Sequence, residues 1–243
     1  MEYLMSWYWD KGHFREKNED SFSMQKVRMR HKEAAFLIVC DGIGGLPEGE
    51  TAGGFVTERM TEWFYKEGIL EMRGVFWRRK TADSAIFALS QIQQKIECCE
   101  RAEEICCGTT CTLALVKGGR FIVLHSGDSR AYLIGKREKL LTCDHRRGGA
   151  LIRCMGAFGF QPPDKIRGRL KKGEALLLCT DGFCRLAPEG FWKGCLLAEE
   201  KDPGLFYKRL KGAGSFLASQ GEKDNMTALL LVRGKGGGLY ESA

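Results

Sequence analysis

The sequence has no hydrophobic run that approaches the roughly 18 residues needed to cross a membrane as a helix. Its first residues, MEYLMSWYWDKGHF, lack the basic start, the long apolar core and the small-residue cleavage site of a signal peptide. It also has no G-x-S-x-G motif, and His125, Ser126 and Asp128 are too close together along one strand to form a catalytic triad. We therefore expect a cytoplasmic protein that is neither a membrane protein nor a serine hydrolase.

The 11 cysteines are numerous for a chain without an export signal, which indicates reduced thiols and not a disulfide framework. The pairs at 98–99 and 106–107, followed by Cys111, raise the question of a zinc site. They do not repeat the usual C-x-x-C spacing, and the first pair falls within a helical pattern. Packing of small buried thiols is the favoured interpretation.

The net charge of +7 is modest, and basic clusters occur at three places: KVRMRHK at 26–32, FWRRK at 76–80 and KIRGRLKK at 165–172. A nucleic-acid-binding protein would accompany such clusters with a recognition helix or stacking aromatic residues. Neither motif is present, so no nucleic-acid partner is expected. Solvated faces, or attraction for an anionic phosphoprotein, account better for the clusters.

The apolar and charged fractions, 44% and 28%, are ordinary for a globular protein. Short runs rich in branched and aromatic residues predict strands, and 3.6-residue periodicity predicts helices. The predicted strands are 20–28, 34–40, 111–116, 121–125, 130–134, 175–179 and 227–232; the predicted helices are 50–67, 82–105 and 203–219. Because strands and helices are segregated along the chain, the pattern favours an α+β fold with antiparallel sheets in a single domain, 1–233, followed by a Gly-rich tail, 234–243.

Acidic residues border the predicted strands. Two fully apolar runs end in Asp-Gly, at Asp41 and at Asp181. Further acids lie in the turns beside other strands: Glu19, Asp20, Asp128 and Asp224. Each by itself is ordinary turn chemistry. Together they suggest carboxylates that converge where strands end, which requires cations to offset their repulsion. Oxygen ligands without a histidine cluster favour Mg²⁺ or Mn²⁺ over zinc.

The ordered set FREKNEDSF, VCDGIGG, GTTCTLALV, HSGDSRAYLI, LTCDH, LLLCTDGF and KDNMTALLLV resembles the metal-dependent serine/threonine protein phosphatases of type 2C, in their bacterial form. The matching motifs extend from about residue 11 to 232. The resemblance implies a four-layer α-β-β-α sandwich of two antiparallel sheets flanked by helices, with two Mn²⁺ or Mg²⁺ ions in the cleft between the sheets.

The resemblance also implies roles for individual residues. Asp41 would bridge the two ions, and Asp181 and Asp224 would complete the first metal site. Glu19 and the carbonyl of Gly42 would hold the second ion, and Asp20 would orient its waters. Arg15 would bind the phosphoryl group, for which a planar guanidinium is suited. The two ions would generate hydroxide near neutral pH and stabilise charge at phosphorus.

Three positions depart from the family pattern. Ile43 stands where eukaryotic relatives have a histidine proposed to protonate the leaving group. Arg185 replaces an aspartate that helps Asp128 to hold a third metal, so a third ion is doubtful, and the guanidinium could substitute for its charge. The segment 146–175 is shorter than the family's flap region, although RCMGAFGFQPPD resembles part of it.

Two other functions stay open at this point. The same fold could serve as a catalytically weak or inactive module that binds phosphoproteins and regulates them, with Arg15 and the basic surface retained. Nucleic-acid binding ranks third. If the chain is the enzyme, its partners are phosphorylated proteins, substrates of a bacterial Ser/Thr kinase, and it is expected to act as a monomer.

Overall fold

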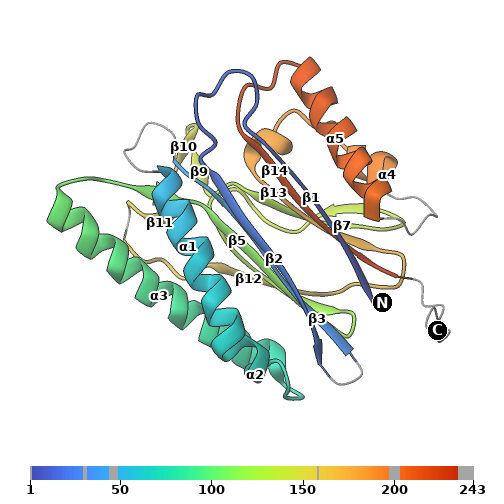
Figure 1. The fold of residues 1–243 in the computed structure, drawn as a ribbon, viewed down its shortest axis with the longest axis horizontal. Coiled ribbons are helices and arrows are strands. Elements are labelled where there is room, and N and C mark those ends of the chain that lie inside the picture. The colour runs from blue at the N-terminus through green and yellow to red at the C-terminus, as the bar shows by residue number, and fades with distance from the viewer. Residues whose placement is uncertain (1, 30–31, 44–48, 158, 197–202, 235–243) are drawn as a thin grey trace.

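The computed structural model describes residues 2–29, 32–43, 49–157, 159–196 and 203–234, and two five-stranded antiparallel sheets dominate it (Figure 1). The first sheet has the strand order β1 (Tyr3–Asp10), β14 (Met226–Arg233), β13 (Ala175–Cys179), β7 (Arg130–Ile134) and β8 (Glu138–Leu140). The second has the order β12 (Asp164–Arg169), β6 (Arg120–Ser126), β5 (Cys111–Lys117), β3 (Lys32–Asp41) and β2 (Asp20–Met29).

Helices cover the outer face of each sheet (Figure 1). The second sheet is covered by α1 (Gly49–Trp63), by a π-helical turn (Phe64–Gly68) that leads into α2 (Ile69–Glu71), and by α3 (Trp77–Glu103). The first sheet is covered by α4 (Phe191–Leu196) and α5 (Pro203–Ser219). The layers therefore follow the order α-β-β-α, which confirms the architecture expected from the sequence.

Burial on both faces explains why the central strands are almost entirely apolar. In β3, Phe36 and Ile38 pack under the helices, whereas Leu37 and Val39 point into the space between the sheets. In β13, Leu177 packs toward α4 and α5, and its neighbours face the inter-sheet core. Because successive side chains of a strand alternate between faces, a strand covered on both faces shows no polar alternation.

Four short strands and one 3₁₀ turn complete the fold at one end of the sheets. Strand β4 (Gly108–Thr109) pairs with β11 (Met155–Gly156), and β9 (Arg146–Arg147) pairs with β10 (Ala150–Leu151). The 3₁₀ helix Asp181–Phe183 follows β13 directly. Figure 1 shows β9, β10 and β11 toward the upper left end of the sheets.

The predicted strands are all present, but among the strands of the two large sheets the sequence interpretation missed β1, β8 and β12, and it also missed the four short strands. In β1, the residues YLMSWYWD are nearly all apolar, so they show no alternation, although the strand lies at a sheet edge. In β12, the residues DKIRGR look like a solvated basic segment and become a strand only by pairing with β6. Both strands depend on a distant partner, which local patterns do not reveal.

The helix boundaries differ slightly from the predicted ones. Helix α3 begins at Trp77 and not at residue 82, and it ends at Glu103, because Glu104 takes a left-handed conformation with φ of 53°. The predicted helix 50–67 is α1 together with the π-helical turn. The predicted tail, except for Gly234, falls outside the described residues. Within the part of the chain described, no helix combines the length and apolar character needed to cross a membrane.

Candidate active site

Strand ends bring the predicted acidic residues together at the upper end of the sandwich. They line one cavity of about 360 Å³ together with three arginines. Its lining residues are Arg15, Glu19, Asp41, Gly42, Ile43, Thr110, Asp128, Arg146, Leu151, Asp181, Arg185, Asp224 and Asn225. The expectation that acids more than 200 residues apart in the chain converge there is therefore met by the geometry, and only Asp20 lies behind the cavity surface.

Asp41 ends β3 opposite Asp20, the first residue of β2. Its backbone is held by Thr110, whose N–H donates to the Asp41 carbonyl at 2.8 Å and whose hydroxyl accepts from the Asp41 N–H at 2.9 Å. No hydrogen bond or ion pair from a described residue reaches the Asp41 carboxylate. Burial raises the pKa of this carboxyl well above its usual value, and the nearby carboxylates of Asp20 and Asp181 raise it further.

Gly42 allows two backbone segments to meet beside Asp41. A Cβ atom at this position would lie 2.6 Å from the backbone carbon of Gly49, at the start of α1, and 3.0 Å from the carbonyl oxygen of Glu19. Any other residue would push these segments apart. Glycine at position 42 therefore allows the start of α1 and the Glu19 backbone to lie close to the end of β3. The Gly42 N–H donates to the Glu19 carbonyl at 3.2 Å.

Asp20 is buried behind the cavity, where one of its oxygens is satisfied and the other is not. Its Oδ2 accepts hydrogen bonds from the hydroxyls of Thr180, at 2.9 Å, and Thr227, at 2.6 Å. Its Oδ1 has no hydrogen-bond partner among the described residues. Burial raises the pKa of Asp20 to about 7, although the two threonine hydroxyls oppose the shift. An unpaired buried carboxylate oxygen is costly and indicates a missing polar partner.

Asp181 follows β13 and Asp224 precedes β14, and the antiparallel pairing of these strands brings the two acids to the same end of the sheet. Gly182 makes their approach possible, because a Cβ atom there would lie 2.2 Å from the Asn225 carbonyl oxygen and 2.9 Å from Cβ of Asp224. The Asp181 carbonyl accepts from the N–H groups of Cys184 and Arg185, which closes the 3₁₀ turn. Burial is the main cause that raises the pKa of Asp181, while Arg185 opposes it.

Asn225 positions Glu19 and was given no role in the sequence analysis. Its Oδ1 accepts from the Glu19 N–H at 2.9 Å, and its Nδ2 donates to the carbonyls of Lys11, at 2.8 Å, and Lys17, at 3.0 Å. It therefore ties the 11–19 segment to the start of β14. Its place directly after Asp224 in the KDNMTALLLV motif is the signal that could have identified it.

Three guanidinium groups contact the acids. Arg15 Nη2 lies 2.9 Å from Oδ1 and 3.0 Å from Oδ2 of Asp224. Arg185 Nη1 lies 2.9 Å from Asp181, and its Nη2 contacts the buried Glu222. Glu222 was also missed from the sequence; its Oε1 accepts from the N–H of Asp224 at 3.0 Å and so supports the turn that carries this acid.

Asp128, which the family pattern links to a third metal, is paired with an arginine. Arg146 Nη1 lies 2.8 Å from Asp128 and 3.5 Å from Asp181. Burial raises the pKa of Asp128 to about 6, and Asp181 raises it as well, whereas Arg146 lowers it. Arg146, on the short β9–β10 hairpin, thus contacts Asp128, whereas Arg185, to which the sequence analysis gave a substituting charge, contacts Asp181.

Within the described residues, no three Asp, Glu, His or Cys side chains are arranged closely enough to enclose an ion. The donor chemistry nevertheless fits a divalent cation. The carboxylate of Asp41 has no described partner, Asp20 has an unpaired buried oxygen, and neighbouring acids raise one another's pKa. Hard oxygen donors of this kind suit Mg²⁺ or Mn²⁺. Ile43, which lines the same cavity, has no group that could donate a proton.

The cysteines that suggested zinc do not join this site. Cys98 and Cys99 are exposed on α3, as is Cys106 beyond it, whereas Cys107 and Cys111 are buried. Burial raises the pKa of the Cys107 thiol to about 11, which keeps it protonated at neutral pH. All eleven cysteines are free thiols.

Sequence comparison places the chain among known proteins. The model of a family described as protein phosphatase 2C matches residues 13–194. The serine/threonine phosphatase Stp of Listeria monocytogenes serovar 1/2a is 24% identical over 254 residues, which cover 92% of this chain and 93% of the relative. The Stp of Listeria innocua serovar 6a matches to the same extent.

Structural comparison agrees with the sequence matches. The serine/threonine phosphatase Stp1 from Staphylococcus aureus superposes with a TM-score of 0.76 and 26% identity, over 94% of each chain. The catalytic domain of the serine/threonine protein phosphatase PstP, solved in complex with 2 manganese ions, superposes with a TM-score of 0.72 and 23% identity, over 96% of this chain and 98% of that one. The latter likeness concerns the fold.

Proposed function

The chain belongs to the protein phosphatase 2C family, and on this premise we propose that it is a Mn²⁺- or Mg²⁺-dependent phosphatase that hydrolyses phosphoserine and phosphothreonine in proteins. The observation that carries the proposal is the carboxylate of Asp41, unpaired among the described residues in a cavity that also holds Glu19, Asp181 and Asp224. The names of the relatives, serine/threonine phosphatases, support the substrate class.

Asp41, Asp181 and Asp224 would hold one divalent cation, and Asp41, Glu19 and the carbonyl of Gly42 a second. Asp20, behind them, would accept hydrogen bonds from the water around the second ion. The manganese ions named for PstP support this assignment. Divalent cations in such a site lower the pKa of water toward neutrality and offset the charge that develops at phosphorus during in-line displacement.

The arginines would receive the substrate's phosphoryl group. Arg15 lies half-exposed at the cavity surface. Its contact with Asp224 offsets the negative charge of that carboxylate, as a bound metal ion would. A phosphoryl group offers several oxygens to a planar guanidinium and would compete for this contact. Hydrogen bonds to Asp224 raise the pKa of Arg15, so it stays charged throughout the working pH range.

A third ion at Asp128 is not part of the proposal. Arg146 already places a positive charge on this carboxylate, and Arg185 occupies the position of a further acid in the family pattern. The proposed partners are proteins that a bacterial Ser/Thr kinase has phosphorylated. Because Ile43 has no group that could donate a proton, a water molecule or another group would protonate the leaving group.

The proposal is tested by the hydrolysis of an aryl phosphate and of a phosphothreonine peptide, with and without millimolar Mn²⁺. We expect activity that requires the ion and that falls about 100-fold or more in the variant Asp181→Asn, because charge stabilisation at the reacting centre is lost. Glu103→Gln, an exposed change at the end of α3, is the matched control and should retain full activity. A folded protein that binds Mn²⁺ but hydrolyses neither substrate would instead indicate the regulatory phosphoprotein-binding module.

A further inference from the structure

Described members of the three basic clusters, which the proposed active site does not use, meet at the opposite end of the sandwich. They surround three adjoining cavities of about 750, 390 and 760 Å³. The first two share Lys32, Arg73 and Lys117, and the last two share Val75 and Arg120. We call this continuous concavity the distal basic groove.

The groove is strongly positive. Nine of the described residues that line it are basic, and one, Asp83, is acidic. The basic residues are Arg28, Lys32, Arg73, Arg78, Arg79, Lys80, Lys117, Arg120 and Arg167. Asp83 pairs with Lys165 at 2.8 Å, outside this set, and with Arg79 only at 3.9 Å. Most of the positive charge is therefore not offset by described carboxylates.

Crowding of these cations is visible in their electrostatics. Burial and then Arg120 and Arg167 lower the pKa of Arg78. Burial and then Lys32 lower the pKa of Lys117, whose ammonium group donates to the carbonyl of Met72. Like charges held together in this way gain from a bound anion, which relieves their mutual repulsion.

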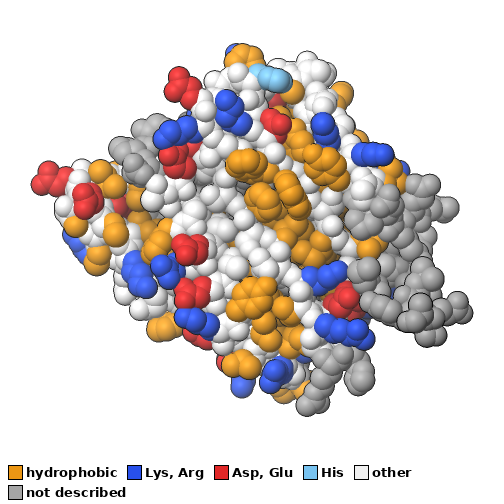
Figure 2. Space-filling model, viewed as in Figure 1, with side chains coloured by type: hydrophobic (Ala, Val, Ile, Leu, Met, Phe, Trp, Pro, Cys, Tyr) orange, Lys and Arg blue, Asp and Glu red, His pale blue; other side chains and the backbone are white. Residues whose placement is uncertain are grey.

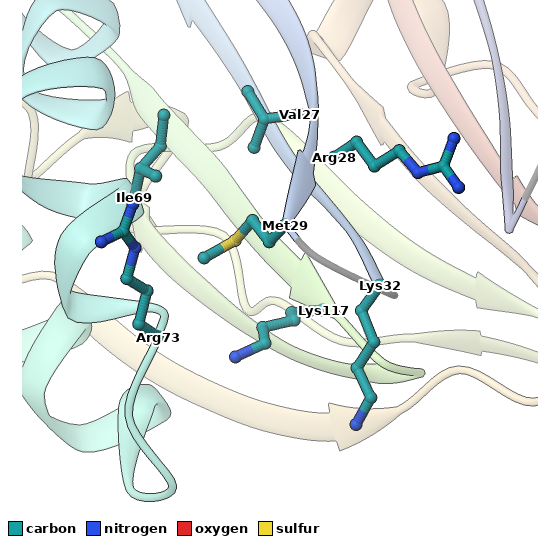
Figure 3. Close-up of a pocket in the computed structure, with 7 residues that line it drawn as sticks. All are labelled: Val27, Arg28, Met29, Lys32, Ile69, Arg73 and Lys117. Carbon is teal, nitrogen blue, oxygen red and sulfur yellow. The ribbon is translucent and has the colours of Figure 1, made fainter.

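The groove also has apolar walls. Figure 3 shows Val27 and Met29 of β2 and Ile69 of α2 around the first cavity, with Lys117 and Arg73 beside them. Farther along, Val75 and Phe76, in the loop between α2 and α3, are 85% and 79% exposed. Figure 2 shows blue Lys and Arg side chains and orange hydrophobic ones side by side at the lower end of the molecule.

We propose that the distal basic groove binds an extended acidic segment, with interspersed apolar residues, of the phosphoprotein substrate. The concave shape argues against a membrane surface, which meets convex faces, and the apolar walls argue against a nucleic-acid backbone. An extended peptide presents acidic and apolar side chains on alternate sides and so matches cationic rims and apolar walls together. The identification of the partner as substrate rests on the proposed function.

The distance between the groove and the active site sets the spacing of the docking segment. Strand β3 leads from Lys32 at the groove to Asp41 at the active site, and its ten residues span roughly 30 Å at about 3.3 Å per residue. An extended substrate chain therefore needs about nine or more residues between its acidic segment and its phosphorylated residue to reach both places at once.

The test is binding of a fluorescein-labelled, unphosphorylated 14-residue peptide in which Glu alternates with Leu and Phe, followed by fluorescence anisotropy. We expect binding that weakens with salt and falls at least 10-fold in the double variant Arg73→Glu/Arg120→Glu. The matched control, Lys208→Glu/Lys211→Glu on α5, changes the net charge equally at a remote exposed place and should change affinity less than twofold. Arg73→Gln/Arg120→Gln, a milder pair, applies if the first variant does not fold.

Equal loss of affinity in the groove and control variants would overturn the proposal. It would also be overturned by tighter binding of an RNA oligonucleotide or of phosphatidylserine vesicles that depends on Arg73 and Arg120. The peptide assay involves no hydrolysis, so its result is independent of the proposed function. In the enzyme assay, the groove variant should raise KM for a phosphopeptide that carries a distant acidic segment and leave aryl phosphate hydrolysis unchanged.

Discussion

The guanidinium of Arg146 lies 2.8 Å from a carboxylate oxygen of Asp128 and so places a fixed positive charge on an acid that the family pattern links to a metal. Because Asp128 is buried, this charge also opposes the rise of its pKa. Arg146 belongs to the two-residue strand β9, so this short element supplies the positive charge beside Asp128.

Removal of Arg146 should increase metal binding. In Arg146→Ala, Asp128 loses its counter-ion, and we expect the affinity for Mn²⁺ to rise about 10-fold, which corresponds to about 1.4 kcal/mol. Equilibrium dialysis against Mn²⁺ measures this change without any assay of activity. The neighbouring Arg147→Ala is the matched control, since Arg147 is exposed on the same strand, and equal affinities in both variants would contradict the role given to Arg146.

Gly42 should not tolerate a side chain. A Cβ atom there would lie 2.6 Å from the backbone carbon of Gly49, so Gly42→Ala is expected to destabilise the protein by about 1–3 kcal/mol. Urea unfolding measures the difference. At Gly54, within α1, the nearest atom to an added Cβ is Ser21 Oγ at 3.9 Å, so Gly54→Ala should instead stabilise by about 0.5–1 kcal/mol. Similar effects at both positions would refute the close-approach argument.

Asn225 should matter for both stability and activity. Asn225→Leu removes three hydrogen bonds, those with the Glu19 N–H and with the Lys11 and Lys17 carbonyls, which costs about 2–4 kcal/mol of folding stability. Because Glu19 is then no longer held in place, we expect Mn²⁺-dependent hydrolysis to fall while the fold persists. Thermal unfolding and activity are measured beside Gln220→Ala, an exposed change beyond α5 that should alter neither.

Stability should depend on pH through His125, which is fully buried and stacks on His145 with ring centroids 4.8 Å apart. Burial is the main cause that lowers the pKa of His125 to about 4, and His145 lowers it further, although the hydrogen bond to the Cys143 backbone, and then Asp164 and Asp144, oppose the shift. Its Nε2 contacts the Cys143 carbonyl at 3.1 Å and its Nδ1 the Thr112 hydroxyl at 2.9 Å, which suits a neutral ring.

The unfolded chain therefore binds a proton near pH 6.5 that the folded protein takes up only near pH 4. Stability contributed by neutral His125 is complete above pH 6.5 and is lost as the pH falls toward 4, by at most about 3 kcal/mol. Buried acids with raised pKa values act in the opposite direction, so the informative quantity is the difference between the natural protein and His125→Gln. In urea unfolding, we expect the free energy of unfolding of the natural protein, minus that of the variant, to rise from pH 4 to 7. A difference that stays constant over this range would contradict the assignment.

The local sequence pattern was enough to predict most of the strands and helices and to identify the acidic residues of the candidate site. Apolar runs such as 34–40 and 175–179 predict buried strands, because burial of both faces leaves no room for polar side chains. The Asp-Gly pairs at their ends predict sharp turns with a carboxylate at the sheet edge. Both patterns involve only neighbouring residues in the sequence, so they can be recognised without knowing which strands pair.

Long-range packing decided which distant strands pair and which side chains contact the acids, and local patterns do not predict either. Strand β12 is a strand because it pairs with β6, and Asn225 is a positioning residue because the 11–19 segment returns to β14. Arg146, and not Arg185, contacts Asp128, and three basic clusters far apart in the chain line one groove. Such contacts depend on where side chains point after distant elements have packed together, and no local periodicity encodes that direction.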